Sequence, residues 1–321
     1  MKSGLRTLNP VLDRELRERS RTMRSIVMLT LFLATLILVL LVTYEGTESA
    51  SAFNGDPFAA LTLRAGRSMF EWVLATELAI MLFIIPGISA NAIAGERDRQ
   101  TLIPLQVTLV GPLGIFLGKV LSSSGFVLLL IVAAAPIMAI PYVVGGISLT
   151  QVLLSLLSLV VLGVMLAAIG VACSAIFRRT LTATLASYGM VLLLTGGTVV
   201  ALAVLSVIDS SRGVDEVEPQ LAALYANPFV AVADAAGDIG SAGFGPFSPI
   251  KKLFIESQLG GDVVIQGDVV FDNQTGEMVD VEPEGGIPLW IRSLGTISML
   301  ALVLSFFGVR RLRAPQRDIR P

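Results

Sequence analysis

Long apolar runs alternate with polar segments along the chain. Six of these largely apolar runs are at least 20 residues long. A helix of about 20 apolar residues crosses the roughly 30 Å hydrocarbon core of a bilayer, so we predict six transmembrane helices. They cover residues 25–44, 72–94, 120–144, 149–177, 181–207 and 289–309.

The residues before the first run form a polar segment rich in arginine. Asn9-Pro10 is a helix-start signal, because asparagine caps helices and proline fits their first turn. Val11, Leu12 and Leu16 then recur on one face, and charged residues occupy the other. This pattern predicts an amphipathic helix that lies in the membrane interface, within residues 1–24.

The longest polar segment, residues 208–288, separates the fifth and sixth spans. Asn227-Pro228 repeats the helix-start signal before the apolar stretch 230–236. Residues 269–271 and 277–281 flank a turn sequence, which predicts a β-hairpin. The fold class is therefore an all-α polytopic membrane protein with six spans, an N-terminal interfacial helix and a small α/β insertion between spans five and six.

Charge assigns the orientation of these spans. Seventeen of the 23 Lys and Arg residues fall in residues 1–24, 95–119, 178–179 and 310–321, and 19 of the 25 acidic residues fall elsewhere. Lys and Arg mark the cytoplasmic side of short loops. We therefore expect both termini to be cytoplasmic, residues 208–288 to be outside, and the chain to lie in the cell inner (plasma) membrane.

The chain thus divides into five parts. They are a cytoplasmic interfacial helix (1–24), spans one to five with a cytoplasmic segment at 95–119 (25–207), an acidic outer segment (208–288), the sixth span (289–309) and a basic tail (310–321).

Composition limits the chemistry. Charged residues make up 15% of the chain, against about 25% in soluble proteins. Histidine is absent and Cys173 is the single cysteine, which excludes catalytic triads and His- or Cys-ligated metal sites. Gly118-Lys119 lacks the surrounding residues of a phosphate-binding loop. We therefore expect no enzyme activity, no metal or cofactor bound by this chain, and no nucleic-acid partner.

Two features inside the spans are candidate sites. Glu77 is an intramembrane ionisable residue, which is a functional candidate unless its side chain reaches the outer interface. Gly163, Ala167, Gly170 and Ser174 form a small-residue face on the fourth span. Such a face suits close helix packing, although small residues are common in membrane helices generally.

The segment after the second span carries a dense cluster of charged and polar residues. This cluster consists of Glu96, Arg97, Asp98, Arg99, Gln100 and Thr101. It is either a solvated loop or, because it alternates both signs of charge, a docking surface for a soluble partner.

The same segment resembles the membrane subunits of ABC-2 type ABC transporters. Residues 91–102 read Asn-Ala-Ile-Ala-Gly-Glu-Arg-Asp-Arg-Gln-Thr-Leu, and residues 117–120 read Leu-Gly-Lys-Val. Both motifs are similar to the family's pattern between its second and third spans. The Asn-Pro-Val-Leu start of residues 9–12 is similar to the family's N-terminal helix. The resemblance covers residues 5–207 and the last span, and leaves out the acidic outer segment.

The resemblance implies a permease without its own ATP site. The cluster Glu96–Thr101 would begin a coupling helix that docks on a separate ABC ATPase subunit, which would bind ATP and Mg²⁺. A second permease copy or a paralogue would complete the transporter. Export is the expected direction, and the substrate is not identified.

Two other classes of function compete with this interpretation. One is a membrane scaffold or sensor that binds an extracytoplasmic protein through residues 209–288. The other is a self-contained channel or secondary transporter, which would require polar groups at mid-membrane. The predicted spans contain few such groups.

Overall fold

A computed structural model describes most of the chain. The described residues are 23–54, 58–100, 111–212, 224–237, 245–251, 263–266, 269–272 and 288–313. Three predicted features therefore lie outside them: the interfacial helix before residue 23, Thr101, and the tail beyond residue 313.

The described residues contain six helical segments that are long and apolar enough to cross a membrane. This confirms the all-α polytopic class. The segments are α2 (Met23–Asn54), α3 (Phe58–Ser89) followed by α4 (Asn91–Asp98), α6 (Pro112–Val144), α7 (Leu149–Ile176), α8 (Thr180–Leu192) continued by η1 and α9 (Thr198–Arg212), and α13 (Leu289–Arg313).

Several of these helices are longer than the predicted spans. α3 begins at Phe58 rather than at residue 72, and α6 begins at Pro112 rather than at residue 120. Hydropathy detects only the part of a helix that lies in hydrocarbon. Polar residues can extend a helix beyond that part without changing the hydropathy signal.

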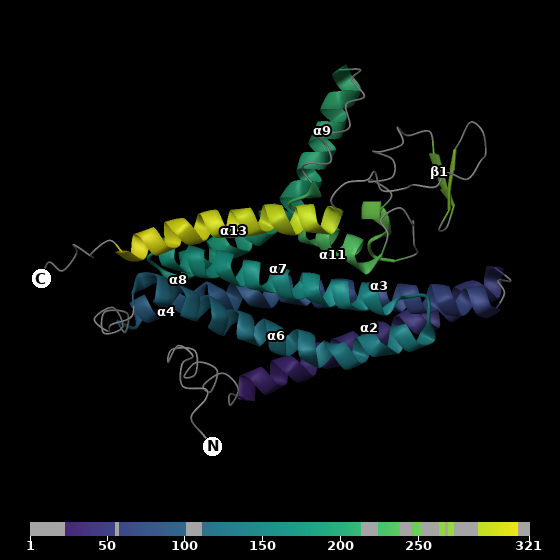
Figure 1. Ribbon diagram of the computed structural model, residues 1–321, viewed down its shortest axis with the longest axis horizontal. Helices are drawn as coiled ribbons and strands as arrows, with labels where there is room; N and C mark the ends of the chain where they lie inside the picture. Colours follow the sequence, from purple (N-terminus) through teal and green to yellow (C-terminus); the bar gives the residue numbers. More distant parts are fainter. Residues whose placement is uncertain are drawn as a thin grey trace, which may run out of the picture.

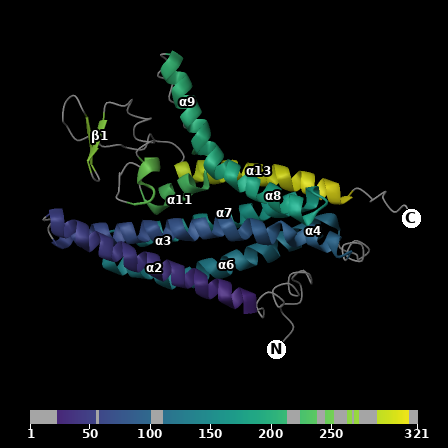
Figure 2. The same ribbon diagram turned by 180° about the vertical axis from the view of Figure 1, so that it is seen from behind.

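Helix α7 lies at the centre of the bundle. It packs against α3, α4, α6, α8, α13 and the short helix α11 (Pro228–Ala236). Figure 1 shows the long helices side by side along the longest axis, and Figure 2 shows α2 on the side of α3 away from α13.

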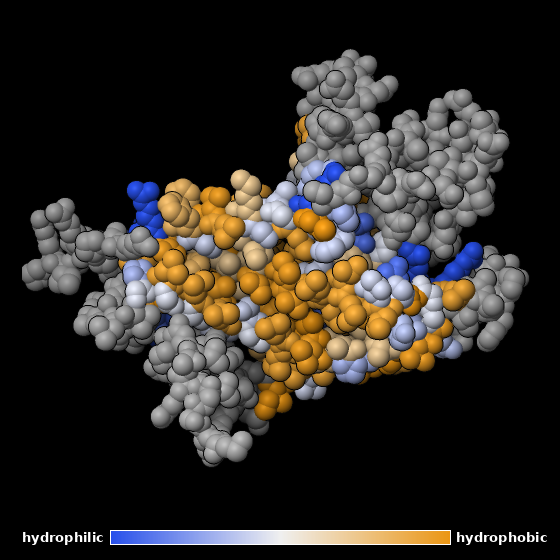
Figure 3. Space-filling model, viewed as in Figure 1, coloured by the Kyte–Doolittle hydropathy of each residue, from blue (hydrophilic) through white to orange (hydrophobic). Residues whose placement is uncertain are grey.

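The outer surface carries large apolar side chains such as Phe83, Val143 and Leu302. Figure 3 shows an orange, hydrophobic band along the bundle, and an apolar surface of this kind suits contact with lipid.

The two ends of the bundle differ in the elements that they carry. The α4 end holds α4, the start of α6, the α7–α8 turn and the end of α13 (Figure 1). The opposite end, which we call the α11 end, holds α11 and the α6–α7 turn. Gly145 and Gly146 in that turn have φ values of 114° and 83°, which favour glycine. The turn passes close to Leu63 of α3. A Cβ atom on Gly146 would overlap the carbonyl oxygen of Leu63.

The fifth span is interrupted by a π-helix, η1 (Leu193–Gly197). Beyond it, α9 turns away from the rest of the bundle (Figure 1). Asn227 supports the interruption, because its side-chain nitrogen donates to the Thr195 carbonyl at 3.2 Å and to the Thr198 hydroxyl at 2.9 Å. Its side-chain oxygen accepts from the Phe229 N–H and so caps α11. The predicted start signal of this helix is confirmed.

The segment between spans five and six also contains two strands, β1 (Val263–Gln266) and β2 (Val269–Asp272). They pair antiparallel, with Val263 opposite Asp272. The predicted hairpin, which joins 269–271 to 277–281, stays a prediction. The strand at 269–271 pairs with the residues before it, and 277–281 lies outside the described residues. Only Gly267-Asp268 links the two strands in sequence, and a two-residue link that begins with glycine favours a tight hairpin.

Candidate functional site

The start of α4 is held by a side chain of α7. Ala90, the residue between α3 and α4, offers no side-chain cap to the new helix. The hydroxyl of Ser174 instead accepts hydrogen bonds from the N–H groups of Ile93 at 3.0 Å and Ala94 at 2.8 Å. Ile93 belongs to the first turn, where a helix leaves N–H groups without internal partners, and Ala94 is the next residue. α7 therefore supplies the missing acceptor.

The end of α7 is held in turn by α4. The Arg97 guanidinium donates to the carbonyl oxygen of Phe177 at 2.9 Å. Phe177 is the C-cap of α7, where carbonyl groups lack partners and positive charge is favourable. Arg97 therefore supplies a hydrogen-bond donor to a carbonyl group at the C-terminus of α7, about 80 residues further along the chain.

The start of α8 is also held by α4. Arg179, the N-cap of α8, makes no side-chain capping bond. The Asp98 carboxylate accepts the backbone N–H of Thr180 at 3.3 Å and also its hydroxyl. A carboxylate at a helix N-terminus is favoured by the helix dipole and by the free N–H groups. Arg97 and Asp98 thus cap the two helices on either side of the α7–α8 turn.

Helix α6 is joined to α4 by an ion pair. The Lys119 ammonium lies 2.5 Å from a carboxylate oxygen of Glu96, and the Lys119 side chain is only 5% exposed. Lys119 is the one charged residue in the sequence of α6. A charge-assisted hydrogen bond of this kind is stronger than a neutral one, so Glu96 connects α4 firmly to the start of α6.

An apolar cluster lies beneath these polar contacts and includes residues from four helices. Its buried members are Ala92 and Ile93 of α4, Phe116 and Val120 of α6, Val171, Ala172 and Ala175 of α7, and Leu312 of α13. Because protein interiors are close-packed, this cluster fixes α4 against the three longer helices.

The six residues predicted to form the coupling cluster fall into distinct groups. Glu96, Arg97 and Asp98 make the contacts within the chain described above. Arg99 and Gln100 are exposed beyond the end of α4, and Gln100 has a φ of 59°, which is uncommon for a residue other than glycine. Thr101 lies outside the described residues.

The small-residue face of α7 is buried within this chain. A Cβ on Gly163 would overlap Val127 of α6, and one on Gly170 would overlap Ser89 of α3. Ala167 is fully buried. Ser174, the fourth member, is the residue that caps α4. Of this face, only Ser174 therefore joins the site at α4.

Glu77 lies apart from that site and does not reach the surface. Its exposed fraction is 0%, so the alternative that it reaches the interface was wrong. Neither carboxylate oxygen has a hydrogen-bond partner. Met81, one turn further along the same face, lies against the position of Gly163 in α7, so Glu77 faces the packed interior of the bundle.

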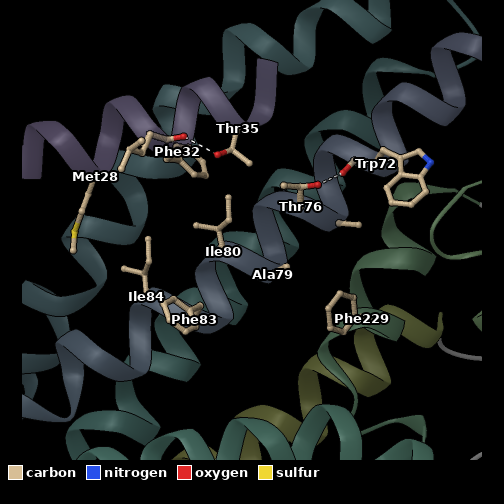
Figure 4. Close-up of a pocket in the computed structure, with 12 residues that line it drawn as sticks. Met28, Phe32, Thr35, Trp72, Thr76, Ala79, Ile80, Phe83, Ile84 and Phe229 are labelled. Carbon is tan, nitrogen blue, oxygen red and sulfur yellow. Dashed lines mark hydrogen bonds between the residues drawn. The ribbon is translucent and has the colours of Figure 1, made fainter. Parts of the chain in front are cut away.

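A groove lies on another face of α3, between α2, α3 and α11 (Figure 4). Its volume is about 670 Å³. The hydroxyls of Thr35 and Thr76 donate to carbonyls of their own helices, those of Leu31 and Trp72, so the lining is apolar. The lining residues are Met28, Leu31, Phe32, Thr35, Trp72, Ala75, Thr76, Ala79, Ile80, Phe83, Ile84 and Phe229.

Sequence patterns missed several residues of the site at the α4 end. Lys119 and Thr180 were not predicted as members, and Ser174 was predicted only as a packing residue. Each contacts α4 across a separation of 23 to 82 residues, which no local spacing encodes. The one available signal was Lys119, because a lone charge in an apolar helix requires a partner.

Comparison with known proteins identifies the family. The model of the ABC-2 family transporter proteins matches residues 10–255. The match extends further into the outer segment than the sequence motifs indicated, and it ends before α13. No curated protein matches the chain. The chain therefore belongs to the ABC-2 family and is a multi-pass membrane permease of an ABC transporter.

Proposed function

We propose that this permease exports its substrate with energy from a separate ATPase subunit, which docks at the α4 end. The asymmetric distribution of Lys and Arg supports a cytoplasmic α4 end. In this proposal two permease copies, identical or similar, pair with two ATPases, and ATP and Mg²⁺ bind to the ATPases.

The observation that carries the proposal is the exchange of caps between α4 and its neighbours. Ser174 caps the start of α4, while Arg97 and Asp98 cap the end of α7 and the start of α8. A cap contributes about 1 kcal/mol, and the apolar cluster beneath adds close packing. A force applied to α4 would therefore reach α6, α7 and α8 together, which is what conversion of ATPase closure into movement of the spans requires.

The proposal assigns docking and transmission to different residues of the cluster. Arg99 and Gln100 are exposed and are available to a partner, so we assign them to docking. Glu96, Arg97 and Asp98 are engaged with other helices, so we assign them to transmission. This division refines the expectation that the whole cluster contacts the ATPase.

Purification of the permease with its ATPase tests the proposal. Arg99→Ala with Gln100→Ala should reduce the amount of ATPase that copurifies. Asp98→Ala with Ser174→Ala should leave the ATPase bound and abolish the change in ATP hydrolysis that association with the permease causes. Arg64→Ala at the α11 end is a matched control for loss of an exposed arginine and should behave as the unaltered protein.

Two results would contradict this proposal. One is the absence of any ATPase from the purified wild-type permease. The other is an unchanged complex with unchanged ATP hydrolysis in both double variants.

The alternative function, an outer scaffold or sensor, lacks a comparable observation. In the described part of the outer segment, α11 and Lys251 are buried against the bundle. Lys251 lies 2.8 Å from the Glu71 carboxylate of α3. These contacts bind the segment to the permease itself, so we propose no second function.

A further inference from the structure

Arginines from three separate elements meet at the α4 end. Arg97 and Arg99 belong to α4 and its end, Arg178 and Arg179 to the α7–α8 turn, and Arg310 and Arg311 to the last turn of α13. All of them are exposed except Arg97, which is partly buried. We call the five exposed arginines the arginine surface, and Arg97 lies beside them with its guanidinium on the Phe177 carbonyl.

Packing of α13 against α7 brings the three elements together. A Cβ on Gly308 would lie 3.3 Å from the Cα of Ala172 and 3.4 Å from the Cβ of Ala175. One turn further along, Leu312 joins the apolar cluster that also contains Ile93 of α4. The end of α13 is therefore fixed beside α4 and the α7–α8 turn, and is not a free extension.

Like charges accumulate where these elements meet. Arg178 and Arg311 are close enough to Arg97 to repel its guanidinium electrostatically. Among the described residues at this end, the acids are Glu96 and Asp98. Glu96 pairs with Lys119, and the Asp98 carboxylate attracts Arg97 and Arg179 electrostatically. One carboxylate offsets only part of the charge of five exposed arginines, so an excess of positive charge remains. Converging positive charge of this kind is complementary to a negatively charged partner.

We infer that the arginine surface is the docking surface for an acidic face of the ATPase subunit, with the end of α13 as a third contact beside α4 and the α7–α8 turn. This inference rests on the proposed function and adds to it the chemistry of the partner's surface. The ends of α4 and α13 and the α7–α8 turn lie at the same end of the bundle (Figure 1). Figure 3 shows strongly hydrophilic atoms beside the orange band at this end.

Charge reversal at two of these arginines tests the inference. Arg178→Glu with Arg311→Glu would be made in the full chain and placed in nanodiscs of phosphatidylcholine. The probe is the purified ATPase subunit that copurifies with the wild-type permease. We expect its affinity for the variant to be at least about tenfold lower at low salt, because reversed charges repel an acidic partner. The fall in affinity with added salt should also be smaller.

A matched variant and a second membrane make the outcomes distinct. Arg64→Glu with Arg292→Glu introduces the same charge change at the α11 end, where both residues are exposed, and should bind the ATPase as the wild type does. Thermal melting of both variants checks that they fold. The same titration in nanodiscs that contain phosphatidylglycerol reveals any contribution from anionic lipid.

Each outcome decides one claim. Wild-type affinity in the Arg178/Arg311 variant overturns the inference and leaves the proposed function intact. A loss of affinity that appears only with phosphatidylglycerol also overturns it, and assigns the surface to lipid headgroups instead. A wild-type permease that binds no ATPase overturns the proposed function and the inference together.

Discussion

A single hydroxyl group, that of Ser174, accepts hydrogen bonds from two backbone N–H groups of another helix. Because Ser174 is fully buried, no water can replace it. A buried donor that loses its partner costs about 1–3 kcal/mol, so this small side chain has a large expected effect. Its role differs from that of Ser158, which is equally buried but donates to a carbonyl of its own helix.

Replacement of Ser174 by alanine should therefore destabilise the protein. We expect Ser174→Ala to lower the free energy of unfolding by about 1–3 kcal/mol, because it leaves the first-turn N–H group of Ile93 without an acceptor. Ser158→Ala removes a hydroxyl of the same size and should lower it by less, because the Ser158 hydroxyl is a donor to a carbonyl of its own helix and leaves no N–H group without an acceptor. Thermal melting in detergent would measure both, and equal effects would show that Ser174 is not a cap.

For Glu77 we expect the opposite effect on stability, because its carboxylate has no hydrogen-bond partner to lose. Glu77→Gln keeps the size of the side chain and removes its capacity for charge, which is costly in this environment. The melting temperature of this variant at pH 7 should therefore equal or exceed that of the wild type. Glu77→Ala should melt lower, because it leaves a cavity. A clear drop in Glu77→Gln would mean that the carboxylate has a stabilising partner.

At the scale of elements, hydropathy predicted which segments cross the membrane but not how they touch. The six spans follow from runs of apolar residues, and the start of α11 follows from Asn227-Pro228. The pairing of β1 with β2 was not predicted, because the pattern singled out the turn sequence after residues 269–271 and not the residues before them. The caps of α4 could not be predicted at all, since their partners lie about 80 residues away.

Close contact between α3 and α7 depends on the absence of a side chain at Gly170. A Cβ there would overlap Ser89 of α3 and would approach Ser187 of α8. Overpacking of a close contact costs about 1–3 kcal/mol, so Gly170→Ala should lower thermal stability and the yield of folded protein. Gly295 in α13 has open space around its missing Cβ, so Gly295→Ala should have little effect. Equal tolerance at both positions would contradict this account of the helix contact.

At the scale of the whole molecule, the bundle has two different ends connected by continuous helices. At the α4 end, one short helix holds the termini of its neighbours through capping bonds and an apolar cluster. At the α11 end, buried contacts such as Lys251 with Glu71 hold the outer segment on the bundle. An ATPase acting at the first end would therefore move the helices that carry the second, with α4 as the connection.

The distance between α6 and α13 at the α11 end tests this connection most directly. Spin labels at Val143→Cys and Ile291→Cys occupy exposed positions, and the native Cys173 is buried. In the complex with the ATPase, addition of ATP and Mg²⁺ should change the label distance measured by electron resonance. In the same complex with Ser174→Ala and Asp98→Ala, the ATPase should stay bound and the distance should stay constant. An unchanged ATP-dependent shift in that variant would contradict the claim that α4 transmits the movement.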